Sequence, residues 1–253
     1  MVTIFKDTSY LSQRAAELFV DAAQEAVQKN GRFVVALTGG SSPKQLYQLL
    51  SQEPYRDQVP WQQTYVFWGD ERWVPLTDER SNAKMAKELL LNKVPVPQEQ
   101  IFPMWEDMAP EAYAQKYEQL LKELFNDQAP AFDLILLGMG DDGHTASLFP
   151  HTEVLAEQEK WVAAYYLEPQ SMHRITLTAP LINQAKRILF MTFGENKAKA
   201  LYEVLEGERN PQEYPSQLIQ PQPGSEIYWY VDDKAASRLE KYKLGFGQRT
   251  LYK

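Results

Sequence analysis

The stretch Phe132–His144, which reads FDLILLGMGDDGH, decides the fold of this 253-residue chain. Its first half, Phe132–Leu137, is a largely apolar run with the length of a strand. A run without alternation is typical of a strand that is buried on both faces of a parallel sheet. The second half, Gly138–His144, stops the strand with three glycines, two carboxylates and an imidazole. The stretch therefore predicts a buried parallel strand that ends in a polar loop.

The same arrangement of an apolar strand followed by a polar, glycine-containing break recurs along the chain. Such breaks follow the expected strands Arg32–Leu37, Thr64–Trp68 and Arg187–Phe193. Two more strands are expected at Arg174–Leu177 and Ile227–Val231. Because the carboxyl ends of parallel strands meet at one edge of an open sheet, these breaks are predicted to converge on a single ligand site.

Segments with the periodicity of amphipathic helices separate the strands. In Ser9–Lys29, apolar residues recur at helical spacing with acidic residues between them. A second helix is expected to begin at Pro43, with Ser42 as its cap, and to run through Leu50. The remaining expected helices are Asn82–Leu91, Pro110–Phe125 and Glu195–Leu205. Strands that alternate with helices predict an α/β fold, in which helices cover both faces of a parallel sheet, and we expect one domain over residues 1–253.

Composition restricts the classes of function. The net charge of −8 and the pI near 5.1 argue against a nucleic-acid-binding surface, which needs a basic patch. The absence of cysteine excludes disulfides, thiolate metal sites and cysteine nucleophiles. No apolar segment has the length of a transmembrane helix or the form of a signal peptide. We therefore expect a cytoplasmic monomer whose partner is a small molecule, with neither nucleic acid nor membrane as a partner.

The first break, Gly39-Gly40-Ser41-Ser42, has the composition of an anion cradle. Its glycines let backbone N–H groups approach a phosphate closely, and the helix that follows points its positive end at the same place. A tight turn between a strand and a helix explains these residues equally well, so both interpretations stay open at this point. The spacing of a Walker A loop is absent.

The loop Gly138–His144 has the GxGxxG spacing of a dinucleotide site, but His144 follows directly and no acidic residue is placed to bind a ribose. We interpret His144 instead as a general base, because a neighbouring carboxylate can fix its tautomer and raise its basicity. Asp141 and Asp142 are both candidates for that carboxylate. His151 and His173 lack comparable surroundings and are expected to have no role in the site.

The sequence argues against two further kinds of site, a metal centre and a serine nucleophile. Only three histidines are present, without HxH or HxxxH spacing, so no metal site is expected. Ser147 lies outside any GxSxG motif and is not expected to be a nucleophile. The cations Arg72, Arg174 and Lys197 lie at or near strand ends, and this shared location favours a role in binding an anion over that of ordinary surface charges.

Several motifs together resemble the 6-phosphogluconolactonase family. They are TGGSSP at 38–43, WGDERWVP at 68–75 with Ser81-Asn82 downstream, LLGMGDDGHTASLFP at 136–150, HRITLTAPLIN at 173–183 and GENKAKAL at 194–201. The resemblance extends from about residue 8 to residue 237, and the motif around His144 is the most specific. The segment Leu239–Lys253 matches nothing recognised.

The resemblance implies a fold and a reaction. The fold is a three-layer α/β/α sandwich with a mainly parallel sheet, shared with glucosamine-6-phosphate deaminases. The reaction is the cofactor-independent hydrolysis of 6-phosphogluconolactone, in the oxidative pentose phosphate pathway. The implied catalytic residues are His144, Asp142 and Asp70, although the residues themselves do not say whether Asp142 or Asp141 holds the imidazole. The implied ligands of the substrate are Gly39, Gly40, Ser41, Arg72, Arg174 and Lys197.

Two other functions are alternatives to hydrolysis of the lactone. A deaminase of amino-sugar phosphates carries a Glu a few residues after the histidine, where this chain has Phe149. An apolar ring is expected neither to accept a proton nor to orient an imidazolium. A non-catalytic sugar-phosphate binding protein would need the cations and would have no use for His144. The presence of both sets of residues favours an enzyme, and we expect no release of ammonia from glucosamine 6-phosphate.

Overall fold

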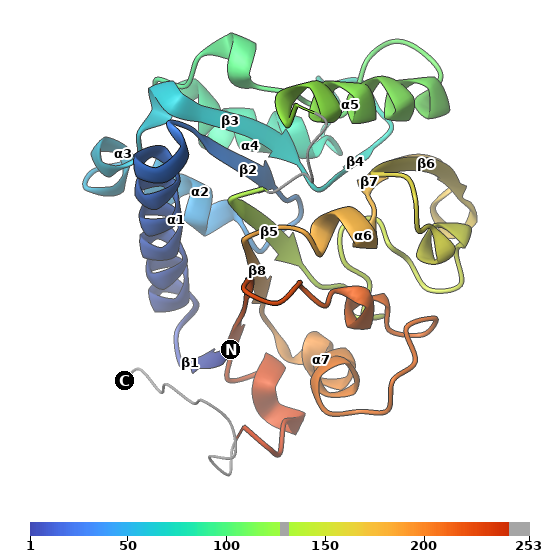
Figure 1. Ribbon diagram of the computed structural model, residues 1–253. Helices are drawn as coiled ribbons and strands as arrows, with labels where there is room; N and C mark the ends of the chain where they lie inside the picture. The colour runs from blue at the N-terminus through green and yellow to red at the C-terminus, as the bar shows by residue number, and fades with distance from the viewer. Residues whose placement is uncertain (127–131, 243–253) are drawn as a thin grey trace.

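A six-stranded parallel sheet forms the centre of the computed structural model, which describes residues 1–126 and 132–242 (Figure 1). The strand order is β1-β9-β8-β5-β2-β3, and every neighbouring pair is parallel. The strands are β1 (Val2–Phe5), β2 (Phe33–Leu37), β3 (Thr64–Trp68), β5 (Leu134–Gly138), β8 (Arg187–Thr192) and β9 (Glu226–Asp232). The expected parallel sheet is thereby confirmed.

Helices cover both faces of this sheet. Figure 1 shows α1, α2 and α3 on one side of the central strands and α6 and α7 on the other. The helices are α1 (Thr8–Asn30), α2 (Lys44–Leu50), α3 (Tyr55–Gln58), α4 (Asn82–Leu89), α5 (Pro110–Leu124), α6 (Ala179–Ile182) and α7 (Ala198–Leu205). Among the described residues, no helix combines the length and the apolar character that a membrane crossing requires.

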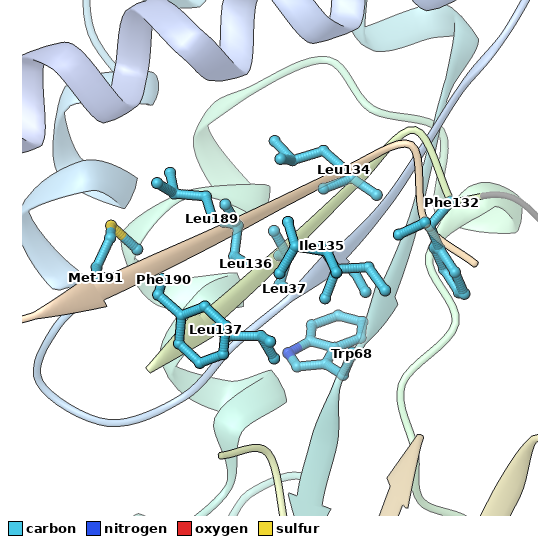
Figure 2. Packing of buried hydrophobic residues seen from close by; sticks show 14 of the residues in the cluster. Leu37, Trp68, Phe132, Leu134, Ile135, Leu136, Leu137, Leu189, Phe190 and Met191 are labelled. Atoms are coloured by element: carbon cyan, nitrogen blue, oxygen red, sulfur yellow. The ribbon is translucent and has the colours of Figure 1, made fainter. Parts of the chain in front are cut away.

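The core is built from the apolar runs that the sequence places in the central strands. Every residue of β2 is buried, and in β5 all but the terminal Gly138 are buried. Figure 2 shows side chains of β5 and β8 packed beside Leu37 of β2 and Trp68 of β3. Phe190 of β8 stacks on Trp229 of β9, with 3.7 Å between ring centroids. Burial on both faces explains why these strands read as continuous apolar runs rather than alternating ones.

A second, smaller sheet, which the sequence did not predict, is antiparallel. Three antiparallel strands form it in the order β4-β7-β6: β4 (Asp70–Arg72), β6 (Val162–Leu167) and β7 (Met172–Leu177). The expected strand Arg174–Leu177 belongs here because β7 pairs with β4, with Arg72 opposite Arg174. The polar segment Asp70–Arg72, expected to be a loop, is a short strand for the same reason.

The topology places an opening between β2 and β5. From β2 the chain continues to β3 on one side, whereas β5 continues to β8 and β9 on the other side. At such a reversal the loops that leave the two strands diverge and leave a crevice at their carboxyl ends, where ligands of open α/β sheets bind. The loops 38–43 and 138–144 leave from these two ends.

Glu71 ties β4 to the start of α4. Its buried carboxylate accepts hydrogen bonds from the backbone N–H groups of Arg72, Asn82 and Ala83, each at 2.8 Å, and from the Ser81 hydroxyl at 3.0 Å. Burial raises the pKa of Glu71 to about 7, against the lowering effect of the backbone hydrogen bonds. The carboxylate therefore satisfies three donors at the start of α4 and one in β4 that would otherwise be unpaired.

We predict that Glu71→Ala lowers the free energy of unfolding by about 2–4 kcal/mol, because it leaves several buried donors without an acceptor. Urea unfolding measures this loss, and Glu99→Ala, which removes an exposed carboxylate, is the control. The folded-state pKa lies above the ordinary value of 4.5, so ionisation of Glu71 costs stability as the pH rises from about 4.5 to 7. The difference between the parent chain and Glu71→Ala should therefore shrink over this interval, and a constant or growing difference would contradict the assignment.

Candidate active site

A pocket of about 200 Å³ lies at the crevice between β2 and β5. It is lined by Thr38, Gly39, Gly40, Ser41, Ser42, Asp70, Arg72, Asn82, Gly138, Met139, Gly140, His144, Ala146, Arg174, Phe193 and Lys197. These residues come from the ends of β2, β5 and β8 and the loops that follow them, from the small sheet, and from the start of α4. The predicted convergence of the polar breaks is confirmed, and of the residues predicted for the site, Asp142 alone is not part of the lining.

His144 and Asp142 form a hydrogen-bonded pair beside the pocket. The Nδ1 atom of His144 lies 2.6 Å from Oδ1 of Asp142, which also accepts the His144 backbone N–H at 3.0 Å. Burial by itself raises the pKa of Asp142, but the hydrogen bonds and the charge of His144 outweigh it and lower the pKa below its ordinary value. An ionised Asp142 requires the proton of a neutral imidazole on Nδ1, so Nε2 is the basic nitrogen. No described residue is a hydrogen-bond partner of Nε2.

This pairing decides between the two carboxylates that the sequence left open, because no hydrogen bond joins Asp141 to His144 in the described part of the chain. His151 and His173 lie outside the pocket, as expected. His151 pairs with Glu213 at 2.9 Å, and His173 lies 3.8 Å from Glu111.

The loop that carries His144 is closed by its own backbone. The Gly140 N–H donates to the His144 carbonyl at 2.8 Å, and Gly143, with φ of +81°, donates to the Gly140 carbonyl at 3.2 Å. A Cβ atom on Gly140 would lie 2.1 Å from Nδ1 of His144 and 2.4 Å from Oδ1 of Asp142. The absence of a side chain at Gly140 is therefore what allows the histidine and the aspartate to meet.

Asp70 and Arg174 form a buried ion pair that Ser147 completes. Arg174 Nη2 donates to Asp70 Oδ2 at 3.0 Å, and Arg174 Nε donates to Ser147 Oγ at 2.8 Å. Ser147 Oγ in turn donates to the same Asp70 oxygen at 2.5 Å. Burial lowers the pKa of Arg174, and the charge of Asp70 opposes this effect. Arg174 thus lines the pocket as predicted, but Asp70 and Ser147 engage two of its nitrogens, and the third, Nη1, donates to Gln170 Oε1 at 3.2 Å.

Arg72 and Lys197 are less constrained than Arg174. Arg72 Nη1 donates to the Arg80 carbonyl at 2.8 Å, and its buried Nε has no hydrogen-bond partner among the described residues. Lys197 lies three residues after Gly194, whose N–H donates to Asp232 at 3.0 Å. Within the described ranges, the Lys197 side chain forms no ion pair. Both cations keep donors available for an anion in the pocket.

The loop after β2 is held from both sides. The buried Tyr47 hydroxyl donates to the Thr38 carbonyl at 2.7 Å and accepts the Thr38 N–H at 3.0 Å. A Cβ atom on Gly39 would lie 1.8 Å from Oδ1 of Asn82, so only glycine fits there.

The expected cap at Ser42 is wrong: α2 starts at Lys44 with Pro43 at its N-cap and no side-chain cap. With seven residues, α2 also adds little helix dipole, and the loop's own N–H groups matter more.

Three residues of the site were missed from the sequence. Ser147 was considered only as a nucleophile, and it instead bridges a carboxylate 77 positions away. Asn82 donates to the Asp70 carbonyl at 2.9 Å. Phe149 stacks on His144, with 4.0 Å between the ring centroids and 23° between the ring planes, a contact that the sequence did not predict. No sequence spacing signals these contacts, which arise where separate loops meet.

No group of three or more His, Cys, Asp or Glu side chains within residues 1–126 and 132–242 is placed to hold a metal ion.

Comparisons with known proteins point to one family. The family model of glucosamine-6-phosphate isomerases/6-phosphogluconolactonase matches residues 6–229. A 6-phosphogluconolactonase of Synechocystis sp. is 40% identical over 242 residues, which cover 94% of this chain and 98% of that protein. The crystal structure of 6-phosphogluconolactonase from Leishmania guyanensis has a TM-score of 0.81 and 29% identity, covering 95% and 98% of the two chains. A monomeric glucosamine-6-phosphate deaminase shares the fold, with a TM-score of 0.79 at 22% identity over 94% of this chain and 99% of that chain.

We predict that Gly140→Ala displaces the His144 ring and destabilises the chain by about 1–3 kcal/mol, because its methyl group overlaps both members of the pair. Urea unfolding and the histidine ring signals in ¹H–¹³C NMR spectra measure the two effects. Gly69→Ala is the control, since a Cβ there meets nothing nearer than the Leu37 carbonyl at 3.6 Å. Equal stability and equal ring signals in the two variants would show that Gly140 is not needed for the geometry.

Proposed function

The chain belongs to the glucosamine-6-phosphate isomerase/6-phosphogluconolactonase family, and on that premise we propose that it hydrolyses 6-phospho-D-glucono-1,5-lactone to 6-phospho-D-gluconate with His144 as the general base. The observation that carries the proposal is the 2.6 Å contact between Asp142 and Nδ1, which leaves Nε2 of His144 as the basic nitrogen in a pocket lined with cations. The names of the related proteins support the same substrate.

The reaction needs one base and a place for negative charge. Nε2 of His144 takes a proton from water as the water oxygen bonds to C1 of the lactone. The tetrahedral intermediate then breaks its bond between C1 and the ring oxygen, and the imidazolium returns the proton to that oxygen. Backbone N–H groups of the glycine-rich loops, or the Arg72 guanidinium, stabilise the charge on the carbonyl oxygen. Asp142 stabilises the imidazolium that forms between the two steps.

The substrate phosphate is assigned to Arg72, Lys197 and the backbone of Gly39–Ser41. Arg72 and Lys197 have donors that no described residue engages, and the loop offers N–H groups without side chains in the way. The whole chain has a net charge of −8, so the cations that line this pocket make the electrostatic potential locally more positive than that of the rest of the chain. Binding at the phosphate would fix the sugar ring so that C1 reaches His144. Arg174, which is paired with Asp70, adds a further positive charge to the lining of the pocket.

The alternatives fit the pocket less well. A deaminase must move a proton on carbon, and Asp70, the carboxylate in position for that role, is engaged by Arg174 and Ser147. Phe149 stands where a deaminase has a glutamate and cannot accept a proton. A non-catalytic sugar-phosphate binding protein would not require the pairing of His144 with Asp142. We also propose that the reaction uses no cofactor or resident metal, and that the chain acts in the cytoplasm as a single-domain monomer.

We predict that His144→Ala lowers kcat on freshly prepared 6-phosphogluconolactone by about 100- to 10,000-fold, the range expected for loss of a general base. Asp142→Asn should give a smaller loss, about 10- to 1,000-fold, because the amide keeps the shape and loses the charge that stabilises the imidazolium. Acid release above the spontaneous background measures both. His151→Ala, outside the pocket, is the control for removal of a histidine.

A His144→Ala enzyme with the parent rate would contradict the mechanism. Sustained ammonia release from glucosamine 6-phosphate that depends on Asp70 would instead favour the deaminase. Binding of 6-phosphogluconate without any hydrolysis of the lactone by the parent chain would favour the non-catalytic binding protein.

We predict that Lys197→Ala weakens binding of 6-phosphogluconate by about one to two orders of magnitude, since a charge-assisted contact contributes roughly 1.5–3 kcal/mol. Isothermal titration calorimetry measures the change, with Lys199→Ala, two positions further in the same segment and exposed, as the control. The unphosphorylated lactone should be a poor substrate of the parent enzyme. Equal turnover of both lactones would contradict the assignment of the phosphate site.

A further inference from the structure

Phe149 contacts two functional side chains of the site, His144 and Arg174. One contact is the stack on His144, with 4.0 Å between the ring centroids and 23° between the ring planes. The other places Cζ of Arg174 5.4 Å from the centroid of the same phenyl ring. The phenylalanine is 8% exposed, whereas the His144 side chain is 26% exposed. A buried apolar ring thus contacts both a partly exposed imidazole and a buried guanidinium.

We propose that Phe149 is a positioning residue, whose ring sets the plane of the His144 imidazole so that Nε2 faces the pocket. The inference rests on the proposed role of His144 as general base and deepens it. The hydrogen bond from Nδ1 to Asp142 alone does not fix that plane, because small rotations about the Cα–Cβ and Cβ–Cγ bonds can tilt the imidazole while Nδ1 stays within hydrogen-bond distance of Asp142. A flat contact along one face of the imidazole removes this freedom, so the two contacts together define the direction of Nε2.

The phenyl ring is itself held in place from two directions. The Phe149 carbonyl accepts the Thr152 hydroxyl at 2.6 Å, which anchors its backbone. The Phe149 side chain is held by Arg174, whose guanidinium is fixed beside the phenyl ring by hydrogen bonds to Asp70 and Ser147. The buried ion pair therefore supports the phenyl ring, and the phenyl ring supports the imidazole.

The stack also suits the chemistry that the base performs. After His144 takes a proton from water, its ring is an imidazolium that faces the electron-rich surface of an aromatic side chain. Cations in this position are attracted by the ring quadrupole. The contact is thus stronger for the protonated imidazole formed during the reaction than for the neutral imidazole that starts it, as a catalytic contribution requires.

The test compares Phe149→Leu, which keeps an apolar side chain and removes the ring, with Phe149→Tyr, which keeps the ring. Phe149→Leu should lower kcat on 6-phosphogluconolactone by about 10- to 100-fold, the scale of a misplaced catalytic group, while KM stays within about twofold. Phe149→Tyr should restore kcat to near the parent value. Phe125→Leu is the matched control, because Phe125 is equally exposed at 8% and lies at the end of α5, outside the pocket.

A spectroscopic readout makes the test independent of activity. The chain has three histidines, so their ring signals in ¹H–¹³C NMR spectra are readily distinguished. Phe149→Leu should remove the ring-current shift of the His144 signals and leave those of His151 and His173 unchanged. Phe149→Tyr and Phe125→Leu should leave all three unchanged. If Phe149→Leu does not fold, as judged by circular dichroism, Phe149→Met takes its place.

The outcomes separate this inference from the function on which it rests. A parent chain that fails to hydrolyse the lactone overturns the proposed function, while the NMR arm still decides whether Phe149 contacts the imidazole. If the parent chain is active, an unchanged kcat in Phe149→Leu overturns the inference even when the ring signals move. Unchanged His144 signals overturn it as well, and so does a loss that appears in KM with kcat preserved.

Discussion

Asp70 and Arg174 are two charges buried in the interior, and each is tolerated only because the other neutralises it. Their pairing joins β4 to β7, and these strands form the side of the pocket that the parallel sheet does not supply. Ser147 is drawn to the same pair, and it fixes the loop that carries His144 three residues earlier. Removing one partner would leave an unpaired charge at the junction of two sheets, so this ion pair supports much of the site's geometry.

The order of the parallel strands sets a second constraint. Neighbours β2 and β5 send their chains in opposite directions, and the glycine-rich loops after both strands border the resulting crevice. Gly39 and Gly140 let those loops approach Asn82 and the histidine-aspartate pair more closely than any Cβ would allow. The strand order thus determines where the pocket lies, and the absence of a Cβ at Gly39 and Gly140 lets its polar groups come within contact distance.

Much of this arrangement could be predicted from the sequence, because it depends on local patterns. Continuous apolar runs such as those of β2 and β5 specify buried parallel strands, and the breaks that follow them specify one ligand edge. The second sheet could not be predicted in the same way. Asp70–Arg72 is too short and too polar to read as a strand, and it becomes one only through pairing with β7, about 100 residues further along the chain. Likewise, Asp141 and Asp142 are equivalent in sequence, and only the turn of the loop places Asp142 against Nδ1.

Phe149 shows why side-chain identity alone is an incomplete guide to role. A phenyl ring neither donates nor accepts a proton. From the sequence, Phe149 therefore indicates only that the glutamate expected of a deaminase is absent. In the folded chain the same ring stacks on His144 and lies within cation–π distance of the guanidinium that Asp70 binds. A glutamate at this position would add a second negative charge beside the ion pair and a second proton acceptor beside the base. An apolar ring instead leaves Asp142 as the one carboxylate hydrogen-bonded to the imidazole among the described residues. This suits the proposed mechanism, in which His144 takes a proton from water and returns it to the leaving oxygen.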